Sequence, residues 1–412
     1  MKRILVLGGG FAGLWSAVGA ARKLDELGVG PREVEVALVN RDAWHCIRVR
    51  NYEADLRDAR VPLDDVLGPI GVARIEAEVT ELDFAHRQVG VQSGSAQRWL
   101  DYDRLVFALG SRLARPALPG IAEYALDVDT WAAGQRLNDH IAALPSRADS
   151  EGRYTALVVG SGLTGVETAT EIAAKLRAAI ASAGDAAGAP PRVILADHGE
   201  HIGSNMGAGA VAVIGAALAQ LGIETRTGVA VAAIDAAGAT LSTGEKIAAA
   251  TVVWCGGMRA HPLTADFAVA HDRFGRIPVD AHLKVKGMDG VFAAGDVASA
   301  LLDDSHASVM SCQHGRPMGR FAGHNAVCDL LGLPMLALRI DWYTTILDLG
   351  AWGAVYTEGW DRHVVTTGAA AKKTKRLINR ERIYPPRSRD AREILAAAAP
   401  IVQAPPPQFA TP

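Results

Sequence analysis

The sequence predicts an α/β fold with two Rossmann-like dinucleotide-binding domains, a two-dinucleotide arrangement, and a smaller C-terminal α+β domain. Residues 3–27 and residues 155–179 read alike, because each is a short apolar strand followed by a glycine turn and an alanine-rich helix. A strand that is apolar throughout is typical of a parallel sheet with both faces covered. Each unit then reaches a second apolar strand, at 34–40 and 192–197. One supersecondary unit is therefore used twice.

Length and composition agree with this fold class and exclude several others. A chain of 412 residues suits two or three α/β units. The net charge of −3 gives no reason to expect nucleic acid as a partner. The four cysteines stand far apart without a CxxC pair, which argues against a zinc cluster, a disulfide framework and a redox-active dithiol. With no apolar leader and no run of about twenty apolar residues, we expect a cytoplasmic protein.

The first glycine turn has the spacing of a dinucleotide site. Gly8, Gly10 and Gly13 form G-x-G-x-x-G directly between strand and helix. The first glycine permits a tight turn, the second lets the backbone approach a pyrophosphate, and the third lets the helix pack close to the strand. Backbone N–H groups and the helix N-terminus then meet the phosphate charge.

The second turn repeats the motif at Gly160, Gly162 and Gly165. Two such motifs indicate two dinucleotides that are held near each other. Redox chemistry needs this arrangement, because a nicotinamide and a flavin must stack for hydride transfer. The sequence therefore predicts an oxidoreductase.

The residue at the end of each second strand distinguishes the two sites. Asn40 occupies this position in the first unit and can bind a ribose hydroxyl without charge assistance. Asp197 occupies it in the second unit, where a carboxylate accepts from the ribose 2′-hydroxyl and repels a 2′-phosphate. We therefore expect NADH rather than NADPH. A simple turn residue at the strand end is the alternative reading of Asp197.

Three further motifs carry a resemblance to a known family. They are FALGS at 107–111, VVWCGGMRA at 252–260 and VFAAGDVA at 291–298. With the glycine turns, they make residues 1–385 similar to the pyridine-nucleotide flavoprotein superfamily, and within it to the type II NADH:quinone oxidoreductases. The resemblance implies an FAD-binding domain at 1–118 and 270–332, an NAD(P)H-binding domain at 119–269, a C-terminal domain at 333–390 and a loose tail at 391–412.

The resemblance also implies which residues bind each cofactor. Asp296 would bind the ribityl chain of FAD and can at the same time cap the helical turn that follows. The full FAD set is Gly8, Gly10, Phe11, Ala12, Gly13, Asn40, Arg41, Ala108, Gly110, Gly295 and Asp296. The NADH set is Gly160, Gly162, Gly165, Asp197 and Gly257.

Three side chains are candidates for the chemistry. Glu167 would orient the nicotinamide–flavin stack, although a carboxylate near a helix start is also favoured by the helix dipole. The segment 310–319 opens a helix whose N-terminus would point at the flavin, and Gln313 would contact a quinone carbonyl. His314 would supply a proton, with a buried, hydrogen-bonded histidine as the alternative. Cys312 is expected to be a small core residue.

The C-terminal region has two features of its own. Its aromatic residues are expected to pack the C-terminal sheet, with stacking of one of them on the acceptor as the alternative: Trp342, Tyr343, Trp352 and Trp360. Its basic run would meet anionic lipid headgroups or form a solvated face: Lys372, Lys373, Lys375 and Arg376. Family members carry amphipathic membrane helices here, whereas this chain offers only the apolar run AREILAAAAPIV. Peripheral contact with the inner face of a membrane and a homodimer therefore both stay open.

The leading hypothesis is hydride transfer from NADH to FAD, followed by electron transfer to a quinone in a ping-pong reaction. A sulfide:quinone oxidoreductase is disfavoured because no cysteine occurs between Cys46 and Cys255, and a disulfide reductase because a dithiol is missing. A soluble reductase or hydroxylase of an aromatic metabolite is a second alternative. An NADH-sensing interaction protein of the apoptosis-inducing-factor type is the alternative from a different class.

Overall fold

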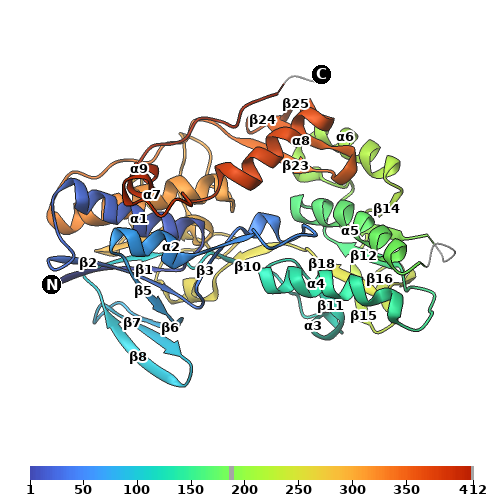
Figure 1. Cartoon of the computed structure of the whole chain (residues 1–412), viewed down its shortest axis with the longest axis horizontal. Coiled ribbons are helices and arrows are strands. Elements are labelled where there is room, and N and C mark those ends of the chain that lie inside the picture. The colour runs from blue at the N-terminus through green and yellow to red at the C-terminus, as the bar shows by residue number, and fades with distance from the viewer. Residues whose placement is uncertain (185–189, 410–412) are drawn as a thin grey trace.

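Two parallel sheets of the same design organise the chain, in a computed structural model that describes residues 1–184 and 190–409 (Figure 1). Neighbouring strands in both sheets run parallel. The first sheet has the order β21 (Val291–Ala293), β9 (Arg104–Phe107), β1 (Lys2–Leu7), β2 (Val34–Asn40), β5 (Ala73–Glu76). The second has the order β11 (Ala125–Leu126), β18 (Thr251–Trp254), β12 (Thr155–Val159), β13 (Arg192–Ala196), β14 (Ile223–Arg226). The two Rossmann-like units predicted from the repeat are confirmed.

In each sheet the strand that leads into a glycine turn is the central one. Residues 4–7 of β1 are fully buried, and every residue of β12 is buried. Helices α1 (Phe11–Glu26) and α5 (Leu163–Ser182) follow directly after the turns. Both glycine turns therefore lie at the carboxyl ends of central strands, where ligands bind in open α/β sheets.

Helix α7 (Cys312–Leu331) packs directly on α1 through small residues. A Cβ atom added to Gly319 would lie 2.3 Å from the Ala12 carbonyl oxygen, and one added to Gly323 would lie 1.9 Å from that of Ser16. Figure 1 shows the two helices side by side although they lie far apart in the sequence. This contact places the N-terminus of α7 next to the first glycine turn.

Three antiparallel sheets of three strands each lie outside the parallel ones. The sheet nearest the C-terminus has α8 (Gly368–Leu377) packed on it and also contacts α5 and α6 (Ala208–Gln220). The three sheets consist of β6 (Glu78–Asp83), β7 (Gln88–Ser93) and β8 (Ala96–Asp101); β15 (Val231–Asp235), β16 (Gly238–Leu241) and β17 (Lys246–Ala248); and β23 (Thr344–Asp348), β24 (Ala354–Glu358) and β25 (His363–Thr367).

Short elements complete the described chain. The helices are α2 (Leu63–Leu67), α3 (Ile121–Tyr124), α4 (Trp131–Ala143) and α9 (Ala391–Ala397). The paired strands are β3 (Trp44–Cys46) with β4 (Arg60–Pro62), β10 (Ser111–Leu113) with β19 (Met258–Ala260), and β20 (Ile277–Pro278) with β22 (Ala298–Ser299). Within the ranges 1–184 and 190–409, no helix is both long and apolar enough to cross a membrane.

The expectation of a loose tail at 391–412 is wrong for residues 391–409, and residues 410–412 lie outside the described part. Helix α9 buries Ile394 completely in the main hydrophobic core. The proline-rich stretch that follows is fixed by its carbonyl groups, since Tyr356 Oη donates to the Pro406 oxygen at 3.2 Å and Thr374 Oγ1 donates to the Pro407 oxygen at 3.0 Å. Proline removes N–H donors but leaves the carbonyl acceptors available.

The glycine contacts between α1 and α7 yield a stability prediction. Gly323→Ala would force the helices apart, so we expect the free energy of unfolding to fall by about 1–3 kcal/mol. Gly215, in α6, is the matched control, because nothing lies within 4 Å of a Cβ atom there. Gly215→Ala should stabilise the protein by about 0.5–1 kcal/mol through helix propensity. Denaturant unfolding of both variants measures the difference, and equal effects would contradict the proposed close packing.

Candidate functional site

One large cavity connects the two glycine turns. Its volume is about 2110 Å³, whereas pockets for a single small ligand span roughly 300–1,000 Å³. Its lining includes Gly10 from the first turn, Gly162 from the second, and Ser311 at the start of α7. The segment 342–346 of the C-terminal region closes another side. The cavity therefore has room for more than one ligand.

The two glycine turns have the same local geometry. Gly8 has φ 102°, and its added Cβ atom would lie 2.5 Å from the Ala108 carbonyl oxygen. An added Cβ atom on Gly13 would lie 1.8 Å from the Gly8 carbonyl oxygen, whereas nothing lies within 4 Å of one on Gly10. The second turn repeats these three relations at Gly160, Gly165 and Gly162. The first and third glycines thus fix the turn, and the second leaves its backbone open for a ligand.

Asn40 and Asp197 occupy equivalent places beside these turns. The Gly9 N–H donates to Asn40 Oδ1 at 2.8 Å, and the Ser161 N–H donates to Asp197 Oδ2 at 2.5 Å. Burial opposes the charge of Asp197, but the N–H groups of Gly199 and Ser161 outweigh it and lower the pKa of this carboxyl group. Asp197 is therefore ionised and still lines the cavity.

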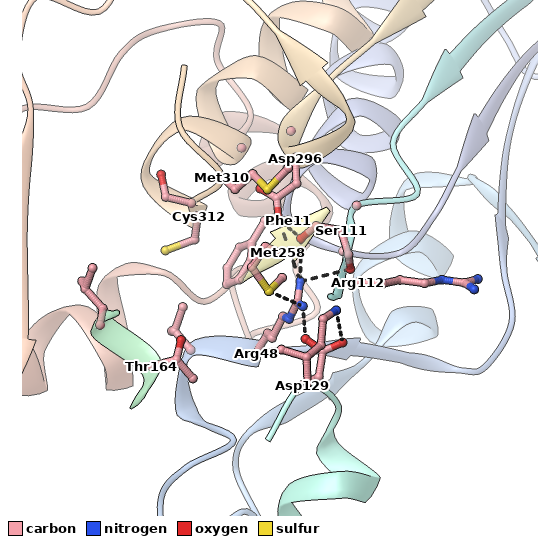
Figure 2. A pocket seen from close by; sticks show the side chains of 18 of the residues that line it. Phe11, Arg48, Ser111, Arg112, Asp129, Thr164, Met258, Asp296, Met310 and Cys312 are labelled. Atoms are coloured by element: carbon pink, nitrogen blue, oxygen red, sulfur yellow. Dashed lines mark hydrogen bonds and ion pairs between the residues drawn. The ribbon is translucent and has the colours of Figure 1, made fainter. Parts of the chain in front are cut away.

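Figure 2 shows a network of hydrogen bonds and ion pairs among residues that line the cavity at the first site. Ser111 Oγ donates to Asp296 Oδ2 at 2.6 Å, and Arg48 donates to Ser111 Oγ at 2.9 Å while it forms an ion pair with Asp129. Burial raises the pKa of Asp296, while Ser111 and Arg48 act in the opposite direction. Sequence reasoning missed Arg48 and Asp129 because no motif contains them. Ser111 stands in the FALGS motif and could have been included.

Glu167 lies at the junction of α5 with the C-terminal sheet. The residue is 5% exposed, and its carboxylate accepts from the Asp348 N–H at 3.0 Å and lies 2.7 Å from Lys375 Nζ. Lys375 also donates to the Ile346 carbonyl oxygen at 3.1 Å. Burial raises the pKa of Glu167, and Lys375 counteracts this effect. Both side chains line the cavity.

This pairing corrects the expectation for the basic run. Lys375 is buried, so it belongs neither to a headgroup-binding surface nor to a solvated face. Lys372 is turned inwards as well and pairs with Asp348. Only Lys373 and Arg376 are exposed.

The start of α7 brings Gln313 to the cavity. Ser311 caps the helix by accepting from the His314 N–H at 3.3 Å. Gln313 Oε1 accepts from Thr344 Oγ1 at 3.2 Å, and the Gln313 amide nitrogen lies 3.5 Å from His314 Nε2. The amide group has two N–H bonds, so one remains for a ligand carbonyl. Gln313 and Cys312 both line the cavity.

His314 does not have the surroundings of a proton donor, and that prediction is corrected. Its side chain is fully buried and lies outside the cavity lining, next to the rings of Tyr343 and Trp360. His314 Nδ1 accepts from the Val309 N–H at 2.9 Å. Burial lowers the pKa of His314 to about 4, so the ring is neutral at physiological pH. His314 is instead a buried, hydrogen-bonded histidine, which is the second of the two interpretations from the sequence.

The cysteines do not form a redox pair. All four are free, although Cys46, Cys255 and Cys312 line the same cavity. Burial raises the pKa of Cys46 to about 11 and that of Cys255 to about 12, so these thiols are poor nucleophiles. Within the described part of the chain, no group of three His, Cys, Asp or Glu side chains is arranged to bind a metal ion.

The remaining residues of the predicted cofactor sets fall into two groups. Gly13 and Gly165 are buried between helix and strand and do not line the cavity. All others line it: Phe11, Ala12, Arg41, Ala108, Gly110, Gly295 and Gly257.

The position of His314 predicts a pH effect on stability but not on catalysis. The folded-state pKa near 4 lies below the ordinary 6.5, so the unfolded state binds the proton first as the pH falls. Wild-type protein should therefore lose about 2 kcal/mol of stability at this one residue between pH 7 and pH 5. His314→Asn keeps an acceptor for the Val309 N–H and should lose correspondingly less. Unfolding at both pH values measures this difference. Steady-state rates between pH 5.5 and 8 should have the same profile in both proteins, and loss of an acidic limb in the variant would restore the catalytic assignment.

Comparison with known proteins gives relatives for nearly the whole chain. An NADH dehydrogenase-like protein of Mycobacterium tuberculosis is 56% identical over 403 residues, which are 98% of this chain and 99% of the relative. A type II NADH:quinone oxidoreductase of Staphylococcus saprophyticus is 24% identical over 372 residues, 85% of this chain and 88% of the relative. The resemblance inferred from the motifs is thus confirmed.

The fold and the family agree with these relatives. The structure of NDH2 from Plasmodium falciparum in complex with NADH superimposes with a TM-score of 0.74 at 13% identity, over 96% of this chain and 97% of that one. The profile of the pyridine nucleotide-disulphide oxidoreductases matches residues 2–319. The chain therefore belongs to the pyridine nucleotide-disulphide oxidoreductase family, and it is an oxidoreductase.

Proposed function

We propose that this protein oxidises NADH and passes the electrons through FAD to a quinone. The observation that carries the proposal is the single cavity that both glycine turns and the start of α7 line together. The names of the relatives point the same way, since one is an NADH:quinone oxidoreductase. Peripheral attachment to a membrane and a homodimer stay predictions.

FAD fits the first site by the shape of the backbone. A side chain at Gly10 would extend into the open cavity, where backbone N–H groups and the N-terminus of α1 suit a pyrophosphate. Asp296 is positioned by Ser111 and Arg48 and would accept from ribityl hydroxyl groups. When bound, the flavin supplies a centre that accepts a hydride and passes on two electrons.

NADH fits the second site. Gly162 and the N-terminus of α5 suit its pyrophosphate, and Gly257 also lines the cavity. The ionised Asp197 would accept from a ribose 2′-hydroxyl and repel the 2′-phosphate of NADPH. Glu167 would orient the nicotinamide, because its own position is fixed by Lys375 and the Asp348 N–H.

The acceptor would bind at the start of α7. The helix dipole favours negative charge at this N-terminus, and Gln313 offers an amide donor to a quinone carbonyl. Quinone reduction also consumes protons. Lys375 lines the cavity, whereas His314 does not, so the ammonium group of Lys375 would be a cationic hydrogen-bond donor on the acceptor side.

Anaerobic titration tests the proposed reaction. The purified protein should contain FAD, and one equivalent of NADH should bleach its absorbance. NADPH should do so with at least about tenfold lower apparent affinity, because Asp197 repels the extra phosphate. Rapid reoxidation by a quinone such as menadione should follow. A flavin-free protein, or a reduced flavin that quinones do not reoxidise, would refute the proposal.

Gln313→Leu tests the acceptor site separately from the NADH site. Loss of one hydrogen bond to the quinone carbonyl should lower kcat/KM for menadione roughly tenfold. The rate of flavin reduction by NADH in stopped-flow experiments should not change. Trp352→Phe is a suitable control, since Trp352 Nε1 donates to Gln220 Oε1 and does not line the cavity. Slower flavin reduction in Gln313→Leu would mean that Gln313 acts in the NADH half-reaction instead.

A further inference from the structure

Two buried arginines line the cavity beyond the start of α7. Arg316 and Arg320 follow Cys312 at intervals of four residues, so all three lie on one face of the helix. Arg316 is 6% exposed and Arg320 is 2% exposed, yet both contribute to the cavity lining. We call these two residues the arginine pair.

The arginine pair has no countercharge in the described part of the chain. Every ion pair found there involves other residues, and the Nε atoms of both arginines have no hydrogen-bond partner. Both guanidinium groups instead pack against Trp15, at 5.3 Å and 4.4 Å from its ring centroid. Burial lowers the pKa of Arg316 to about 10 and that of Arg320 to about 9, which reflects this lack of partners. An unpaired buried charge costs folding free energy, so a ligand of opposite charge would compensate for this cost at the two arginines.

The surroundings of the arginine pair are positive and apolar. Arg382 also lines this part of the cavity and is fixed by the carbonyl groups of Ala404 and Pro405 in the tail. Ile378, Ile383 and Val402 add apolar lining. An apolar wall next to planar, bidentate donors suits an aromatic ring that carries a carboxylate.

We propose that the arginine pair binds an anionic substituent of the electron acceptor, so that the acceptor is an acidic aromatic quinone rather than a neutral one. This inference rests on the proposed function and narrows its substrate class. The phosphates of FAD have their own donors in the first glycine turn and the N-terminus of α1. The arginine pair lies one and two helical turns beyond the start of α7, next to Trp15 and the C-terminal tail.

Paired quinones of similar size test the proposal. With 1,4-naphthoquinone-2-sulfonate as acceptor, Arg316→Met and Arg320→Met should each lower kcat/KM about 10- to 100-fold, the value of a hydrogen bond to a charged group. With neutral menadione, the change should stay below about threefold. Arg316→Lys and Arg320→Lys keep the charge and should lose only part of the preference. Arg380→Gln removes an exposed charge near Arg382 and serves as the matched control.

A binding measurement gives a readout that does not depend on turnover. Calorimetry of the oxidised holoenzyme with 2-naphthoate should show one site in the wild type, weakened about tenfold or more by either methionine variant. Two outcomes would overturn the proposal: equal kinetic effects on both quinones, and absence of naphthoate binding to the wild type. Loss of FAD from the variants would also overturn it, because the arginines would then bind the cofactor. If no quinone is reduced at all, the proposed function fails, and calorimetry still decides on the anion site. If the methionine variants do not fold, the lysine variants are compared on the two quinones instead, and naphthoate binding to the wild type again tests the anion site.

Discussion

The buried ion pair between Glu167 and Lys375 is the interaction on which the rest of the site depends. Removing two charges from water costs several kcal/mol per ion, so such a pair persists only with good geometry and additional hydrogen bonds. Both conditions are met, because the Asp348 N–H donates to Glu167 and Lys375 donates to the Ile346 carbonyl oxygen. The pair therefore joins α5, strand β23 and helix α8 at one point.

This junction explains how the C-terminal sheet becomes part of the cavity. Glu167 follows the second glycine turn closely, so the residue that fastens the C-terminal sheet also lines the nicotinamide side. Strand β23 in turn supplies Thr344, which donates to Gln313 at the start of α7. The side chains proposed for the two half-reactions, Glu167 and Gln313, thus have hydrogen-bond donors on the same strand. A shift of β23 would move the partners of both Glu167 and Gln313. All five residues of β23 are buried, and this burial holds the strand in place.

Local features could be predicted from the sequence, whereas pairings between distant segments could not. The glycine turns follow from spacing alone, because the third glycine of each motif packs on the carbonyl oxygen of the first glycine within one strand–turn–helix unit. Asn40 and Asp197 were found for the same reason. The contacts of the first glycines with Ala108 and Cys255, which follow other strands, do not follow from this spacing. The sequence places Lys375 with the other basic residues on the surface, since a basic run gives no sign that one of its members meets a carboxylate on another helix. His314 was open between two roles because burial depends on Tyr343 and Trp360, which no motif connects with it. The packed tail was missed because its prolines are bound through carbonyl groups, which every residue carries.

The charged residues of the cavity are of two kinds: those that have partners in the protein, and those that have none and can pair with a ligand. The N-termini of α1, α5 and α7 all open on the cavity and give it a positive potential at three places. The carboxylates inside it have donors from the protein, as Asp296 has in Ser111 and Asp197 has in backbone N–H groups. Arg316 and Arg320 have none within the described residues. Groups that are already satisfied can be rigid scaffolding, whereas an unsatisfied buried charge is stabilised only when a ligand of opposite charge binds. Specificity for the acceptor is therefore expected to come from α7 beyond its first turn, in the part of the cavity where the chain leaves its own charges unpaired.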